Sequence, residues 1–132
     1  MVWQDILLES LHPDARISHA LAKAFAVDRE HVRVVDVDDK FPDTRQLAVV
    51  CVTSSRPRGF KQLLSLHLFN GTERKARDPE VVTIITATLE DRCITLSKSL
   101  NPYTVTLHAP NSASEKRDID PEGYERDEYI IQ

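Results

Sequence analysis

Glycine is scarce in this chain of 132 residues, where Gly59, Gly71 and Gly123 are the three present and lie far apart. A phosphate-binding loop needs glycines a few residues from one another, because the backbone must approach a phosphate with no Cβ in the way. The spacing of the three glycines therefore excludes the standard nucleotide-binding loops.

Cysteine is scarcer still, since the chain has two, Cys51 and Cys93, and neither belongs to a CxxC pair. A metal knuckle built from thiolates is therefore excluded. Unpaired cysteine is among the most buried residue types, so we expect two free thiols inside the core.

Long hydrophobic runs are also missing. No apolar run approaches the ~20 residues that a helix needs to cross a bilayer. The first ten residues, MVWQDILLES, carry an acid where a signal peptide needs a basic region. We therefore expect a cytoplasmic protein that makes no contact with a membrane.

The overall composition is that of an ordinary globular protein. Hydrophobic residues make up 41% of the chain and charged residues 29%, and the net charge is -4. The length fits one domain. Because the chain also lacks a recognisable catalytic motif, we expect no cofactor and favour a protein that is not an enzyme.

Two segments have the apolar spacing of an amphipathic helix. The first runs from about Pro13 to Val27. The second begins at Asp78-Pro79-Glu80, which supplies an N-cap side chain, a proline for the first turn and an acid beside the positive end of the helix. Residues 2–11 fit either a short helix or an edge strand, and we favour the helix.

Five segments rich in β-branched or alternating apolar residues predict strands, at 31–38, 46–53, 60–69, 93–98 and 103–109. The second of these (QLAVVCVT) is apolar on both alternations, which is typical of a central strand with both faces covered. Asn70-Gly71 predicts a turn, and residues 72–77 a basic loop.

The resulting order is helix, three strands, helix, two strands. Short links cannot join parallel neighbours, so we expect an α+β fold with an antiparallel sheet of about five strands and two helices packed on one face. This order is similar to that of small bacterial effector chaperones and immunity proteins, a likeness of architecture from which no residue is carried over.

The apolar content falls after Pro110, so we divide the chain into a single α+β domain, 1–110, and a polar acidic segment, 111–132. Residues 111–123 should run over the surface. The segment ends in an apolar cluster of Tyr129, Ile130 and Ile131. We expect this cluster to dock, either on the sheet or on a second copy of the chain in a homodimer.

Two groups of charges stand out in the sequence. The acidic patch consists of Asp36, Asp38, Asp39 and Asp43, and the basic set consists of Arg56, Arg58, Lys61, Arg74, Lys75 and Arg77. Opposed patches can attract a charged partner. They favour a non-enzymatic module that binds another protein, with the acidic patch meeting a basic partner and raising the association rate. A bacterial immunity protein, antitoxin or chaperone-like adaptor would fit.

Two alternatives stay open. In the first, His31 or His67 converges with Asp36 or Asp38 in one pocket and gives a small metal-assisted or His/Asp-based enzyme. No histidine pair has metal-ligand spacing, so no metal site is assigned. In the second, the basic set contacts a nucleic-acid backbone. The acidic net charge and the 6% of aromatic residues disfavour this second alternative.

Overall fold

The computed structural model describes residues 2–96 and 101–132, and its class is α+β, as the sequence predicts. The strands are β1 (Gln4–Leu8), β2 (Val32–Asp36), β3 (Val49–Ser55), β4 (Gln62–Leu68), β5 (Cys93–Leu96), β6 (Thr104–His108) and β7 (Glu115–Asp118). The helices are α1 (Asp14–Phe25), α2 (Thr72–Lys75), α3 (Asp78–Leu89) and α4 (Pro121–Glu125), with a 3₁₀ turn at Arg29–His31. Residues 97 and 98 of the expected fourth strand lie outside the described residues.

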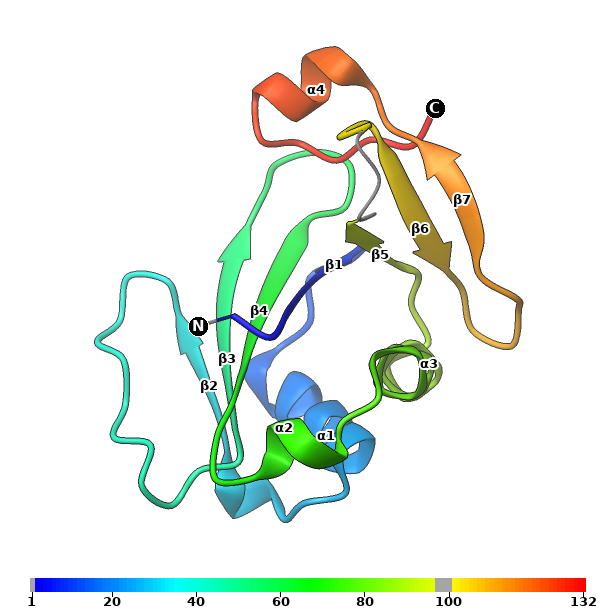
Figure 1. Ribbon diagram of the computed structural model, residues 1–132. Helices are drawn as coiled ribbons and strands as arrows, with labels where there is room; N and C mark the ends of the chain where they lie inside the picture. The colour runs from blue at the N-terminus through cyan, green and yellow to red at the C-terminus, as the bar shows by residue number, and fades with distance from the viewer. Residues whose placement is uncertain (1, 97–100) are drawn as a thin grey trace.

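The described strands form one sheet of seven, in the order β2-β3-β4-β1-β5-β6-β7. The expectation of about five strands was therefore wrong in sheet size, and the order of elements along the chain differs because β1 precedes the first helix and β7 follows β6. Figure 1 shows α1 and α3 against the sheet at one end of the molecule, with α4 and the C-terminus at the other end.

The helix favoured for residues 2–11 was wrong, because this segment contains β1, which lies between β4 and β5 near the middle of the sheet. Ile6, Leu7 and Leu8 are consecutive and all buried. A strand with both faces covered reads as a continuous apolar run, which sequence periodicity does not separate from a buried helix. Pairing with β4 and β5 provides hydrogen-bond partners for the backbone N–H and C=O groups of β1. This pairing makes the segment a strand.

The prediction of a fully antiparallel sheet was also wrong, because β2 pairs with β3 in parallel. Residues 37–48 do not form a hairpin but return along the edge of the sheet to the level at which β2 began. Phe41 in this segment packs edge to face on His67 and Phe69, with ring centroids 5.3 and 6.2 Å away. Those aromatic contacts hold the crossover against the sheet.

One face of the sheet carries the main core, where α1 and α3 lie side by side. Ile17 and Leu21 of α1 and Ile85 of α3 are completely buried against Leu64 and Leu66 of β4. Each such side chain contributes about 1.5–3 kcal/mol when it leaves water. This burial holds α3, whose β-branched residues make it a weak helix by propensity.

The N-terminus of α3 differs by one residue from the expected cap. Arg77 is the N-cap and makes no side-chain cap hydrogen bond, while Asp78 already belongs to the helix.

The C-terminal segment covers part of the opposite face. Residues 111–123, expected to be a surface connection, contain β7 and most of α4, and Ile119 between them is completely buried. Tyr129 and Ile131 pack on a second core that includes Leu7, Phe60 and Ile94. The buried area at Ile119 and the backbone pairing of Ile119 with Ile131 offset the entropy of ordering this polar segment.

Among the described residues, no helix is both long and apolar enough to cross a membrane.

Candidate functional site

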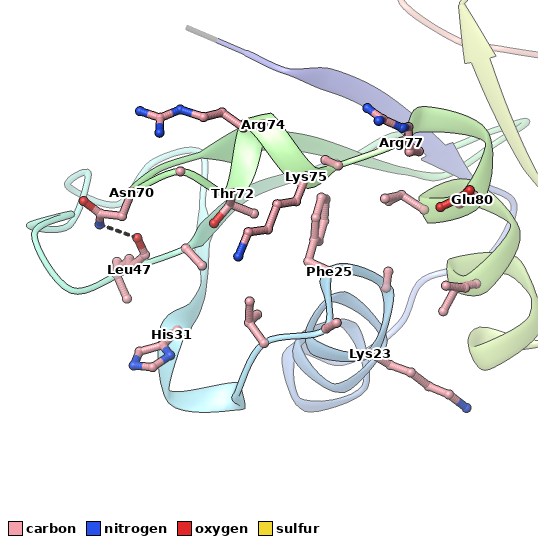
Figure 2. Close-up of a pocket in the computed structure, with 18 of the residues that line it drawn as sticks. Lys23, Phe25, His31, Leu47, Asn70, Thr72, Arg74, Lys75, Arg77 and Glu80 are labelled. Atoms are coloured by element: carbon pink, nitrogen blue, oxygen red, sulfur yellow. Dashed lines mark hydrogen bonds between the residues drawn. The ribbon is translucent and has the colours of Figure 1, made fainter.

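A groove opens where the C-terminal end of α1, α2 and the first turns of α3 meet the residues just before β3 (Figure 2). Its volume is about 1000 Å³. That is the upper end of the range for small-ligand sites, and it is large enough for a short peptide segment. We call it the basic groove.

Five cationic side chains line the basic groove, and one carboxylate, Glu80, accompanies them; the cations are Lys23, Arg45, Arg74, Lys75 and Arg77. In Figure 2, Lys75 extends over the groove between Phe25 and Leu47, while Lys23, Arg74 and Arg77 extend from its rim. This concentration of positive charge belongs to a chain whose net charge is -4.

Most of these cations have no acidic partner. Arg45 pairs with Asp43, N to O at 2.5 Å. The hydrogen bond between them raises the pKa of Arg45 and lowers the pKa of Asp43. Lys23, Arg74, Lys75 and Arg77 form no ion pair with any residue that the structure describes. Their charge is therefore available to a ligand.

Apolar side chains form most of the rest of the lining, and we call them the apolar floor. Of the apolar side chains in the lining, Phe25, Val27 and Ile84 are half-buried, and Leu47, Ala48 and Val81 are buried. Phe25 is held in place by Trp3, whose ring lies edge to face at 5.6 Å between centroids. The basic groove therefore combines a cationic rim with a hydrophobic floor.

Local backbone geometry builds the walls. Asn70 and Gly71 both have positive φ, at 56° and 88°, as the Asn-Gly turn signal predicts. The Asn70 side-chain amide donates hydrogen bonds to the carbonyl oxygens of Leu47 and Thr44, at 2.7 and 2.9 Å. This turn ties the wall that carries Arg74 and Lys75 to the wall before β3. Residues 72–75, expected to be loop, form the single helical turn α2.

The structure divides the basic set of the sequence into two groups. Arg56, Arg58 and Lys61 lie at the hairpin end of β3 and β4, whereas Arg74, Lys75 and Arg77 follow the other end of β4. The seven residues of β4 put about 20 Å between these ends. The six charges therefore do not form one surface.

Two residues of the first group, Arg56 and Arg58, are engaged by the C-terminal segment. Arg56 pairs with Asp127 at 2.6 Å, and its side chain is 13% exposed. Glu128 is buried and lies 3.7 Å from Arg58 and 3.2 Å from Arg126. Arg56 and Arg58 therefore hold the end of the chain in place and are poor candidates for contact with a nucleic acid.

Carboxylates of the acidic patch accept hydrogen bonds from backbone N–H groups within the patch itself. Asp36 ends β2, and its carboxylate accepts the backbone N–H of Asp38 at 3.0 Å. The carboxylate of Asp39 accepts the backbone N–H of Asp36 at 3.1 Å. Asp38 lies in the turn, so it does not share a strand face with Asp36. With Asp43 paired to Arg45, three of the four carboxylates have local partners.

Of the histidines and aspartates proposed for an enzyme, His31 and Asp36 lie at opposite ends of β2. His31 precedes β2 and Asp36 ends it, so about 17 Å of strand separates them. His67 lies opposite Val50, whose other neighbour is Arg33, three residues before Asp36. The Phe41 ring packs against His67.

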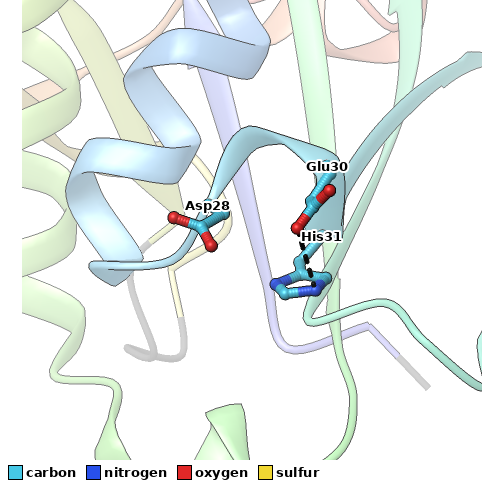
Figure 3. A group of neighbouring side chains, drawn as sticks. All are labelled: Asp28, Glu30 and His31. Carbon is cyan, nitrogen blue, oxygen red and sulfur yellow. Dashed lines mark ion pairs between the residues drawn. The ribbon is translucent and has the colours of Figure 1, made fainter.

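His31 lies instead beside Asp28 and Glu30, and one ligand atom from each of the three falls within 4.8 Å of the others (Figure 3). Glu30 approaches the His31 ring at 3.8 Å. The His31 side chain is 44% exposed and the Glu30 side chain 76% exposed, so water competes for any ion held there. One nitrogen and two oxygen donors on an open surface do not by themselves make a metal centre.

A buried pair that the sequence did not predict joins His12 to Asp91. His12 Nε2 lies 2.8 Å from Asp91 Oδ2, and both side chains are 8% exposed. Asp91 also accepts the backbone N–H groups of Ser10 and Arg92. These contacts fasten the segment before α1 to the turn after α3, which gives the pair a structural role.

Comparison with models of known families, with curated proteins and with solved structures finds no match.

Sequence reasoning missed Lys23 and Arg45, which the fold places beside Arg74 and Lys75. Neither belongs to a charge cluster along the chain. The only signal for Lys23 was its place near the predicted end of the first helix, where cations commonly occur. Its proximity to the other cations depends on how α1 packs on α3.

Proposed function

We propose that this chain is a non-enzymatic module that binds another protein through the basic groove. It would be an adaptor of the kind represented by bacterial immunity proteins, antitoxins and chaperones. The single observation that carries the proposal is the set of four unpaired cations around an apolar floor. Exposed charge without a partner raises association rates and selects for a partner of opposite sign.

The proposal moves the binding surface from the acidic patch to the basic groove. Asp36, Asp39 and Asp43 already have local partners. Lys75 and Arg74 have none among the described residues. A partner would therefore gain more from meeting the unpaired cations than from competing for carboxylates already engaged.

Capture of the partner from the native cytoplasm tests this function. The bait is the full chain, and the test variant carries Arg74→Glu and Lys75→Glu. Both residues are exposed, so the double reversal should leave the melting temperature unchanged. The matched control carries Lys61→Glu and Lys116→Glu, which make the same change in net charge on exposed residues outside the groove.

We expect one protein to be recovered in stoichiometric amount by the wild type and by the control, and lost with the groove variant. Recovery of nothing at low salt by any of the three baits would refute the function. Light scattering on the purified chain separates this partner from self-association into a homodimer.

A further inference from the structure

The chemistry of the basic groove also indicates what kind of segment occupies it. We infer that the groove takes an acidic peptide segment in which carboxylates are interspersed with apolar side chains. The inference rests on the proposed function and adds the chemical class of the partner to it.

The cationic rim accounts for the acidic part of this segment. Lys75 extends over the groove, and Arg74 and Arg77 stand at its edge (Figure 2). The guanidinium groups can each hold a carboxylate through two parallel hydrogen bonds, while the ammonium acts as a point charge. Glu80 is the one carboxylate that the described part of the chain contributes to the lining, so an incoming acidic segment meets a clear excess of positive charge.

The apolar floor accounts for the rest. Phe25, Val27 and Ile84 are half-buried, so each keeps apolar surface in contact with water. A segment of carboxylates alone would leave this apolar surface exposed to water, or it would bury charge against the surface. Burying an unpaired charge costs free energy. Leucine, valine or phenylalanine side chains between the carboxylates would cover it, at roughly 25 cal/mol per Å² buried.

The same features disfavour a nucleic acid as the occupant. Sites for single strands offer several aromatic faces on which bases stack. Among the described residues the lining has two aromatic rings, Phe25 and the His31 imidazole, and Phe25 already packs edge to face with Trp3. A long polyanion would also run past the exposed carboxylates of Asp28 and Glu30, which lie beside His31 at the edge of the groove. A short acidic segment avoids that repulsion.

Fluorescence polarisation with the full chain tests the inference. Three labelled probes of equal length are compared at low salt: a peptide alternating glutamate and leucine, a peptide alternating glutamate and serine, and a single-stranded oligonucleotide. We expect the glutamate–leucine peptide to bind at least tenfold more tightly than either other probe. The double variant Arg74→Glu, Lys75→Glu should weaken it at least tenfold, and Lys61→Glu, Lys116→Glu should not.

The apolar contribution is tested separately by Ile84→Ser. This variant should weaken the glutamate–leucine peptide and leave the glutamate–serine peptide unchanged, provided its melting temperature shows that it folds. If it does not fold, the comparison of the two peptides on the wild type decides the point. Equal affinity for the two peptides, tighter binding of the oligonucleotide, or no effect of the groove reversal would each overturn the inference.

Failure of this inference can be told apart from failure of the proposed function. A photo-reactive amino acid at Thr72, in the groove lining, marks the partner segment that lies there. If a stoichiometric partner is captured but the marked segment is neutral or basic, the protein-binding function stands and the acidic class is wrong. If the marked segment is acidic and apolar, both stand.

Discussion

His12 and Asp91 form a buried side-chain contact, with His12 Nε2 2.8 Å from Asp91 Oδ2 and both side chains 8% exposed. An ionised carboxylate can only accept hydrogen bonds, so the ring nitrogen is then the donor. The backbone of His12 is held independently, because its N–H donates to the Gln62 side chain at 2.9 Å and its carbonyl oxygen accepts from it at 3.2 Å. The entry to α1 is therefore fastened twice.

His12→Ala should lower the free energy of unfolding by about 1–3 kcal/mol, because Asp91 loses a buried hydrogen-bond partner. Denaturant unfolding measures this loss. The matched control is His19→Ala, at an exposed position on α1, which should change the unfolding free energy by less than about 0.5 kcal/mol. Equal effects of the two substitutions would show that the His12 contact with Asp91 adds nothing to stability.

Gly59→Ala should displace the C-terminal segment. Gly59 has φ +72°, and a Cβ there would lie 2.2 Å from the backbone carbonyl oxygen of Tyr129. Gly71→Ala is the matched control, because Gly71 also has positive φ (+88°) but nothing lies within 4 Å of its added Cβ. Both variants bear the strain of a left-handed backbone, roughly 1–2 kcal/mol, and the clash is confined to Gly59.

Limited proteolysis and thermal melting distinguish the two glycine variants. We expect Gly59→Ala to melt at a lower temperature than Gly71→Ala and to be cut faster between residues 119 and 132. Identical melting and cleavage would mean that the contact of Tyr129 with the hairpin is dispensable for holding this segment.

His108 should make the stability of the protein depend on pH. Burial lowers the pKa of His108 below its ordinary value of 6.5, although the charge of Asp78 opposes this. Below about pH 6.5 the unfolded chain takes up this proton before the folded chain does, so unfolding becomes easier as the pH falls. The contribution levels off below the folded-state pKa and is absent above 6.5.

The measurement is the unfolding free energy of the wild type minus that of His108→Gln, followed from neutral to acidic pH. Glutamine can still hydrogen-bond to the Thr95 hydroxyl, which lies 3.0 Å from His108 Nε2. We expect this difference to decrease as the pH falls, because the wild type loses stability that the His108→Gln variant keeps. A difference that is constant with pH would show that His108 has the same pKa in both states.

Cys51 and Cys93 should be unreactive in the folded protein. Burial raises the pKa of both thiols, and the thiolate is the reactive form. A thiol-specific reagent should label neither residue under native conditions and both in guanidinium chloride. Rapid labelling of the native protein would mean that the main core opens readily.

Local sequence signals account for much of the secondary structure. Pro13 and the apolar spacing after it placed the first helix, and Asp78-Pro79 placed the third to within one residue of its cap. Asn70-Gly71 marked a turn that the positive φ values require. These features depend on the φ restriction of proline, the freedom of glycine and asparagine, and the side-chain period of a helix, which all act within a few residues.

Contacts between distant segments decided the rest. Residues 4–8 became a strand because β4 and β5 flank them, and β2 and β3 became parallel because residues 37–48 cross the sheet edge. The tertiary structure also places Arg56 and Arg58 against the C-terminal segment, away from Arg74 and Lys75. It brings Lys23 and Arg45 into the groove that Arg74 and Lys75 line. Charge along a sequence does not say which cations share a surface, because packing of α1 on α3 and pairing of the C-terminal segment set those distances. The amino-acid sequence thus determined the α+β class and the local starts and stops, while the tertiary structure decided where the basic groove lies.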